Sequence, residues 1–169
     1  MKTLYLIGGA MGVGKTTAGR ELKLLLDKSV FLDGDWCWDM HPFTVNDETK
    51  KMVLDNICFM LSSFIKCSAI ENIIFCWVMH EQSIIDEILS RIGISECKVI
   101  PISLTCSKEA LAERLRRDIG TGLRSGDIIK RSTERLPMYL ALDTVKIDVS
   151  EITAAEAAEM IAELGRTEE

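Results

Sequence analysis

The chain has 169 residues and carries 20 Lys and Arg against 26 Asp and Glu, a formal charge of −6. This length fits one α/β domain, so we expect a single domain over residues 1–169. The acidic balance argues against a general nucleic-acid binder, because such binding needs clustered Lys and Arg. The longest uncharged stretch, Thr3 to Gly14, is too short for a membrane-spanning helix. We therefore expect neither nucleic acid nor a membrane as a partner.

The six cysteines include no CxxC pair, and most lie in apolar runs such as Ile57-Cys58-Phe59. Cysteines of this kind are typical of buried, reduced thiols inside the cell. The two histidines are far apart, which gives no support to a zinc site. We expect a cytoplasmic protein, either a monomer or a homodimer.

Predicted strands and helices alternate along the chain. In chain order, we expect a strand at 4–7, a helix from 16, a strand at 30–32, a helix at 47–66, a strand at 73–79, a helix at 82–92, a strand at 99–104, helices at 107–117 and 127–142, a strand at 145–149 and a helix ending at 164. The last helix opens with a capping-box pattern, Thr153-Ala-Ala-Glu156. The alternation implies an α/β fold of three layers, with a five-stranded parallel sheet and helices on both faces.

The motif with the clearest chemistry is Gly-Ala-Met-Gly-Val-Gly-Lys-Thr at 9–16, which fits GxxxxGK[ST] in full between a predicted strand and a predicted helix. In such a P-loop the backbone N–H groups cradle phosphates, and the lysine reaches the β- and γ-phosphates. The Thr16 hydroxyl is placed to ligate Mg²⁺. We therefore expect a P-loop NTPase fold with ATP and Mg²⁺ as cofactors, and a nucleotide site formed by Gly9, Ala10, Met11, Gly12, Val13, Gly14, Lys15, Thr16 and Thr17.

Two carboxylates follow the second predicted strand, in Asp33-Gly34-Asp35. Open α/β sheets bind ligands at the carboxyl ends of their strands. A carboxylate there can hold a magnesium-bound water or accept a proton from a substrate hydroxyl. Asp-Gly-Asp is also good turn chemistry, so capping of the turn is the alternative. Beside a P-loop we favour a functional role, with Asp33 at the metal and both residues as catalytic candidates.

Arginines cluster around a glycine-rich break at 118–127, which we expect to form a short lid. Arg114 and Arg117 end the preceding helix, and Arg124 lies within the break. We expect these three to contact phosphate oxygens or the adenine face, with Arg117 and Arg124 as catalytic candidates. A solvated helix end is the alternative.

Other polar and aromatic residues near the site are less informative. His80 and Glu81 follow the third predicted strand and should face the site, although a lone histidine there is as often structural. Trp36 and Trp38 flank Cys37, and we expect them to be core or hinge aromatics, with stacking on a substrate as the alternative.

The order of these pieces resembles the small P-loop kinases, a group that contains gluconate kinases, shikimate kinases, adenylate-kinase-type enzymes and chloramphenicol phosphotransferases. The likeness extends over nearly the whole chain, and Leu32-Asp33-Gly34-Asp35 with His41-Pro42 is most similar to gluconate kinases. The resemblance implies that Asp33 supports magnesium through water and that Asp35 contacts the accepting hydroxyl. It also implies that Arg114 covers the adenine, with Ser150 along its other edge, and that residues 36–68 bind the acceptor.

The acceptor region departs from these families, because no arginine occurs between Arg20 and Arg91. Kinases of anionic acceptors in this group resemble each other in placing arginines there. We therefore expect an ATP-dependent phosphotransferase that acts on a hydroxyl of a neutral or cationic small molecule. Two alternatives remain: a nucleotide or nucleoside kinase, and a nucleotide-binding regulatory module with weak ATPase activity.

Overall fold

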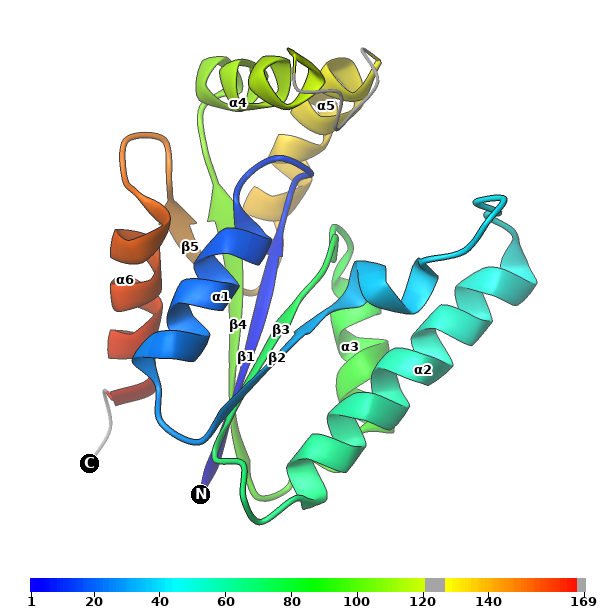
Figure 1. Ribbon diagram of the computed structural model, residues 1–169, viewed down its shortest axis with the longest axis vertical. Coiled ribbons are helices and arrows are strands. Elements are labelled where there is room, and N and C mark those ends of the chain that lie inside the picture. Colours follow the sequence, from blue (N-terminus) through cyan, green and yellow to red (C-terminus); the bar gives the residue numbers. More distant parts are fainter. Residues whose placement is uncertain (121–126, 167–169) are drawn as a thin grey trace.

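The computed structural model describes residues 1–120 and 127–166, which fold around one five-stranded sheet (Figure 1). All four strand pairs are parallel, and the order across the sheet is β2-β3-β1-β4-β5. The strands are β1 (Lys2–Gly9), β2 (Ser29–Asp33), β3 (Asn72–Cys76), β4 (Cys97–Thr105) and β5 (Val145–Asp148). The predicted five-stranded parallel sheet is confirmed.

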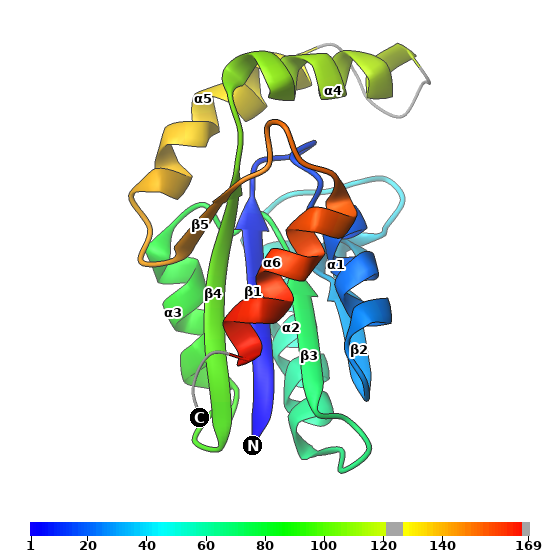
Figure 2. The ribbon, with the colours of Figure 1, turned by 90° about the vertical axis from the view of Figure 1, so that its left-hand side faces the viewer.

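Helices cover both faces of this sheet. The helical segments are α1 (Lys15–Leu25), the 3-10 turn η1 (Gly34–Trp38), α2 (Asp47–Lys66), α3 (Gln82–Arg91), α4 (Lys108–Gly120), α5 (Ile128–Leu140) and α6 (Ala154–Arg166). Helices α1 and α6 lie on one face and α2 and α3 on the other, while α4 extends across the carboxyl ends of the strands (Figures 1 and 2). In the part of the chain that the structure describes, no helix is both long and apolar enough to cross a membrane.

The central strand β1 explains why the core forms where it does. It pairs with β3 from Thr3 opposite Asn72 and with β4 from Lys2 opposite Cys97, so it has a neighbour on each side. Leu4, Leu6 and Ile7 are at most 1% exposed because helices cover both faces. A strand buried on both faces reads as a continuous apolar run, which is the pattern of the sequence here. This packing holds the end of β1, where the P-loop begins, in a fixed place.

Strand β3 ends three residues earlier than the sequence predicts, at Cys76 instead of Met79. The register with both neighbouring strands ends there. Strand β2 ends at Asp33 opposite Cys76, and β1 passes Ile7, whose carbonyl accepts the Trp77 N–H at 3.2 Å, and then enters the P-loop. The apolar run at 77–79 therefore leaves the sheet and turns toward the carboxyl edge.

Helix α4 is longer than predicted, reaching Gly120 instead of Arg117. The first residues of the expected lid at 118–127 are thus helical, and Asp127 is the N-cap of α5. The rest of the expected lid, at 121–126, lies outside the described residues. The predicted capping box of α6 is present: the Thr153 N–H donates to Glu156 Oε2 at 2.7 Å, and the Glu156 N–H donates to Thr153 Oγ1 at 3.2 Å.

Tyr139 of α5 offers a test of the packing. Its side chain is fully buried, its pKa is raised by burial, and its hydroxyl has no hydrogen-bond partner among the described residues. Replacing it with phenylalanine removes the unpaired hydroxyl and keeps the ring. We expect Tyr139→Phe to raise the free energy of unfolding by about 1 kcal/mol, measured by urea denaturation. A fall in stability would mean that the hydroxyl has a partner in solution.

Candidate functional site

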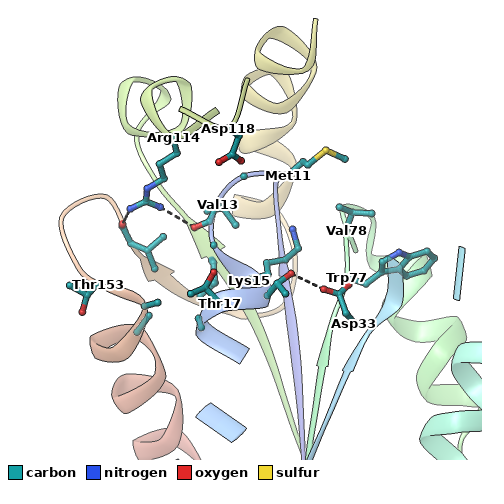
Figure 3. A pocket seen from close by; sticks show the side chains of 18 of the residues that line it. Met11, Val13, Lys15, Thr17, Asp33, Trp77, Val78, Arg114, Asp118 and Thr153 are labelled. Atoms are coloured by element: carbon teal, nitrogen blue, oxygen red, sulfur yellow. Dashed lines mark hydrogen bonds between the residues drawn. The ribbon is translucent and has the colours of Figure 1, made fainter. Parts of the chain in front are cut away.

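A cavity of about 460 Å³ opens at the carboxyl ends of the strands, where α/β folds bind ligands (Figure 3). The P-loop crosses its middle, α4 lies above it, and the loop into α6 closes one side. Lining residues come from elements far apart in sequence: Met11, Gly12, Val13, Gly14, Lys15, Thr16, Thr17, Ala18, Asp33, Asp35, Trp77, Val78, Leu104, Arg114, Arg117, Asp118, Val149, Ile152, Thr153, Ala154 and Ala157. Most of the predicted site residues are thus brought together here.

The P-loop takes the conformation that its glycines allow. Gly12 and Gly14 have φ values of 85° and 108°, a region that other residues rarely adopt. A Cβ on Gly12 would lie 2.5 Å from Leu115 Cδ2, so the loop also packs closely under α4. The Lys15 ammonium donates to the Gly9 and Ala10 carbonyls at 2.8 and 3.0 Å. Gly9 and Ala10 therefore hold the lysine through their backbone oxygens, and neither is among the lining residues.

The two carboxylates lie opposite the start of α1. Asp33 is 7% exposed, and its Oδ2 accepts the Thr16 hydroxyl at 2.7 Å. Its Oδ1 accepts the Asp35 backbone N–H at 3.1 Å, so Asp33 also caps the turn η1. The Asp35 side chain is exposed and lines the cavity. Asp33 is held in place, whereas Asp35 faces the space that a substrate can enter.

Thr16 and Asp33 have the chemistry of a magnesium site. Both supply hard oxygen atoms, and they lie beside Lys15 in the cavity. No group of three His, Cys, Asp or Glu that could hold a metal occurs within residues 1–120 and 127–166. A protein needs only one or two oxygen ligands for Mg²⁺, because phosphates and water complete the shell. The residues therefore fit a magnesium ion that arrives with a nucleotide.

Arg114 lies between the P-loop and the loop before α6. It lies on α4, whose Leu111 and Leu115 are fully buried. Its guanidinium donates to the carbonyls of Val13 at 2.9 Å, Val149, and Ser150 at 3.5 Å. The guanidinium lines the cavity while its donors bind backbone, so it connects the P-loop to the loop before α6. Ser150 does not line the cavity, and its hydroxyl accepts the Ser107 N–H at 2.9 Å.

We expect Arg114→Lys to weaken ATP binding about tenfold, because one ammonium cannot span both loops. Binding of inorganic tripolyphosphate, which lacks the base, should change by less than about twofold, since the P-loop and Lys15 remain. Isothermal titration calorimetry measures both affinities. As a matched control, Arg116→Lys on the same helix, where residue 116 is exposed and outside the cavity, should leave both unchanged. Equal losses for ATP and tripolyphosphate would contradict a bridging role.

Three further residues that the sequence singles out are Arg117, Arg124 and Trp36. Arg117 lines the cavity, and its side chain is 73% exposed with Glu113 at 3.4 Å. Arg124 lies outside the described residues. Trp36 packs edge-on against Phe31, with ring centres 5.5 Å apart.

Near the third strand the sequence points to the wrong residues. His80 and Glu81 do not line the cavity, and the His80 ring nitrogen Nδ1 lies 2.9 Å from the Val78 carbonyl. Strand β3 ends at Cys76, and Trp77 and Val78 line the cavity where the sequence predicts His80 and Glu81. In the sequence, a tryptophan at the end of the apolar run is the signal that could have identified Trp77 as a lining residue.

Comparisons with known proteins agree with this architecture. A family model described as an AAA domain matches residues 6–129. The chain belongs to this family. The match begins within β1 and includes the P-loop, Asp33, Asp35 and Arg114. No curated protein matches the chain.

Solved structures share the fold over nearly the whole chain. A gluconokinase from Sinorhizobium meliloti 1021 has 19% identity and a TM-score of 0.69, covering 97% of this chain and 94% of that one. A tunicamycin resistance protein from Deinococcus radiodurans has 17% identity and a TM-score of 0.68, covering 98% and 96%. A shikimate kinase from Acinetobacter baumannii, in complex with shikimate, has 22% identity and a TM-score of 0.65, covering 99% and 94%. The chain therefore has the fold of small P-loop kinases, as the sequence predicts.

Proposed function

We propose that the protein is an ATP-dependent phosphotransferase that moves the γ-phosphate of ATP to a hydroxyl of a neutral or cationic small molecule. The P-loop with Lys15 supplies the phosphate site, and Thr16 with Asp33 supplies the place for Mg²⁺. Two structures with this fold are named as kinases of small molecules, a gluconokinase and a shikimate kinase, which supports the reaction class.

The charged side chains that line the cavity are the basis for the proposed acceptor class. Among the described lining residues, the cations are Lys15, Arg114 and Arg117, which come from the P-loop end and from α4. The other side of the cavity offers Asp33 and Asp35, and Lys50, Lys51 and Lys66 of α2 are exposed and outside it. Asp33 accepts the Thr16 hydroxyl beside Lys15. Asp35 is exposed to the cavity, and its carboxylate disfavours an anionic acceptor. A neutral or cationic acceptor therefore suits this side.

In the proposed reaction the acceptor oxygen attacks the γ-phosphorus while its proton passes to the Asp35 carboxylate. The bond between the γ-phosphorus and the oxygen bridging it to the β-phosphate breaks, and ADP leaves with that electron pair. Lys15 and the P-loop N–H groups stabilise the charge that develops on the phosphate oxygens. Magnesium, when bound, neutralises part of the same charge. Asp33 stays in place through its bond with Thr16 and orients the metal side of the site.

A panel assay of acceptor-dependent ADP formation tests the proposal. The acceptors are neutral sugars, aminoglycosides, sugar acids, shikimate and nucleoside monophosphates, each with ATP and Mg²⁺, and with EDTA as the metal-free control. We expect turnover with a neutral or cationic acceptor and none in EDTA. Turnover of a sugar acid, shikimate or a monophosphate alone would contradict the proposed acceptor class. ADP formation that no acceptor stimulates would favour a nucleotide-binding regulatory module.

We also infer a reducing, cytoplasmic setting for this reaction. All six cysteines are free thiols, and Cys58 and Cys76 are buried in the core. Burial raises the pKa of the Cys76 thiol far above its usual range, which makes it unreactive. Thiols of this kind are typical of intracellular proteins.

A further inference from the structure

Trp77 lies at the cavity on the side away from Arg114 of α4. It directly follows β3, and its backbone N–H donates to the Ile7 carbonyl at 3.2 Å. Figure 3 shows its indole beside Asp33, with Lys15 between it and Arg114. Trp77 is partly exposed and lines the cavity together with Val78. Trp77 therefore lies on the opposite side of the P-loop lysine from Arg114 (Figure 3).

The indole is fixed against the backbone of η1. A Cβ built on Gly34 would lie 2.5 Å from Trp77 Cγ and 2.6 Å from Cδ1, so the ring packs directly on the glycine. Gly34 itself lies between Asp33 and Asp35, the two carboxylates of the site. The aromatic wall thus packs against the turn that carries both carboxylates. A wall ordered before binding does not lose side-chain entropy when a ligand packs on it.

The chemistry of this part of the cavity selects its ligand. The lining residues contributed by β2, η1 and the segment after β3 are two carboxylates, one indole and one valine: Asp33, Asp35, Trp77 and Val78. Carboxylates accept hydrogen bonds from hydroxyl and amino groups. An indole face binds the apolar face of a ring, and attracts a cation through its quadrupole. Together these groups fit a hydroxylated ring compound without negative charge.

We propose that Trp77 determines acceptor specificity: the acceptor is a neutral or cationic cyclic compound whose ring packs against the indole while a hydroxyl reaches Asp35. This inference rests on the proposed function, since it names the acceptor class of the same cavity. Trp36 is the matched control because it is the same residue type, is 52% exposed and lies outside the cavity lining.

Binding to the wall can be measured without turnover. The protein contains three tryptophans, so 5-fluorotryptophan labelling should give three ¹⁹F resonances, assigned with Trp77→Phe and Trp36→Phe. The nucleotide site is first filled with a non-hydrolysable ATP analogue and Mg²⁺. The probes, added next, are phenyl β-glucoside, kanamycin and gluconate. We expect phenyl β-glucoside or kanamycin to shift the Trp77 resonance and leave that of Trp36 in place. A shift caused only by gluconate, or no shift of Trp77 by either cyclic probe, overturns the inference.

Kinetics of the acceptor that turns over provide the second readout. Trp77→Leu should raise the KM for the acceptor about tenfold, the loss expected for one stacking contact, with the KM for ATP unchanged. Trp77→Phe should restore most of the affinity. An unchanged acceptor KM in Trp77→Leu overturns the inference while leaving phosphotransfer intact. A shifted Trp77 resonance without any phosphotransfer supports the inference about binding and counts against the proposed reaction.

Discussion

Replacing Asp35 with asparagine is expected to reduce phosphotransfer by a factor of about 10²–10⁴ while ATP affinity stays within a few-fold of the wild type. Asparagine keeps the size of the side chain but does not accept the acceptor's proton. The backbone N–H of residue 35 still donates to Asp33, so the turn η1 should keep its shape. Steady-state turnover and ATP titration calorimetry measure the two quantities separately.

Asp27→Asn is the control for this change, because residue 27 is also an exposed aspartate but lies outside the expected acceptor region and does not line the cavity. It should leave turnover and ATP affinity unchanged. Asp33→Asn should behave differently from both, lowering the affinity for ATP with Mg²⁺, because Asp33 accepts the Thr16 hydroxyl. Full activity in Asp35→Asn would remove Asp35 from the proposed mechanism.

The second large effect is expected for Lys15→Met. Methionine keeps most of the side-chain volume and removes the ammonium that we expect to contact the β- and γ-phosphates. Turnover should therefore fall by about 10²–10³. Wild-type protein should gain thermal stability from ATP with Mg²⁺, because a ligand bound only by the folded state stabilises it. In Lys15→Met most of this gain should disappear in differential scanning fluorimetry.

Lys23→Met serves as the control, since residue 23 lies on the same helix, is exposed and is outside the cavity. Its ATP-dependent stabilisation should equal that of the wild type. A normal ATP-dependent shift in Lys15→Met would mean that the P-loop lysine does not contact the nucleotide.

The fold could be predicted from the sequence because its signals are local. Most strands contain a short apolar run, and the P-loop has a fixed spacing of glycines, lysine and threonine between a strand and a helix. The end of β3 could not be predicted in the same way. Residues 77–79 are as apolar as the strand before them, and the register with β1 and β2 ends at Cys76, which depends on tertiary pairing.

The candidate site shows the same division between local and long-range information. Lys15 and Thr16 are identified by a motif, and Asp33 by its place after a strand. The contact between Thr16 and Asp33 is a tertiary one, as is the packing of Trp77 on Gly34. Arg114 could be chosen as a functional residue from the arginine cluster, but its three carbonyl partners depend on how α4 crosses the P-loop. Spacing along the chain carries no information about such contacts.

The most direct test of the account follows the γ-phosphate by ³¹P NMR. The protein is incubated with ATP, Mg²⁺ and a mixture of neutral and cationic hydroxylated ring compounds, with Asp35→Asn run in parallel. We predict that the γ-phosphate signal is replaced by a phosphomonoester signal in the wild type and persists in Asp35→Asn. Loss of the γ-phosphate to inorganic phosphate alone, at equal rates with and without the mixture, would contradict the proposal that the protein phosphorylates such a small molecule.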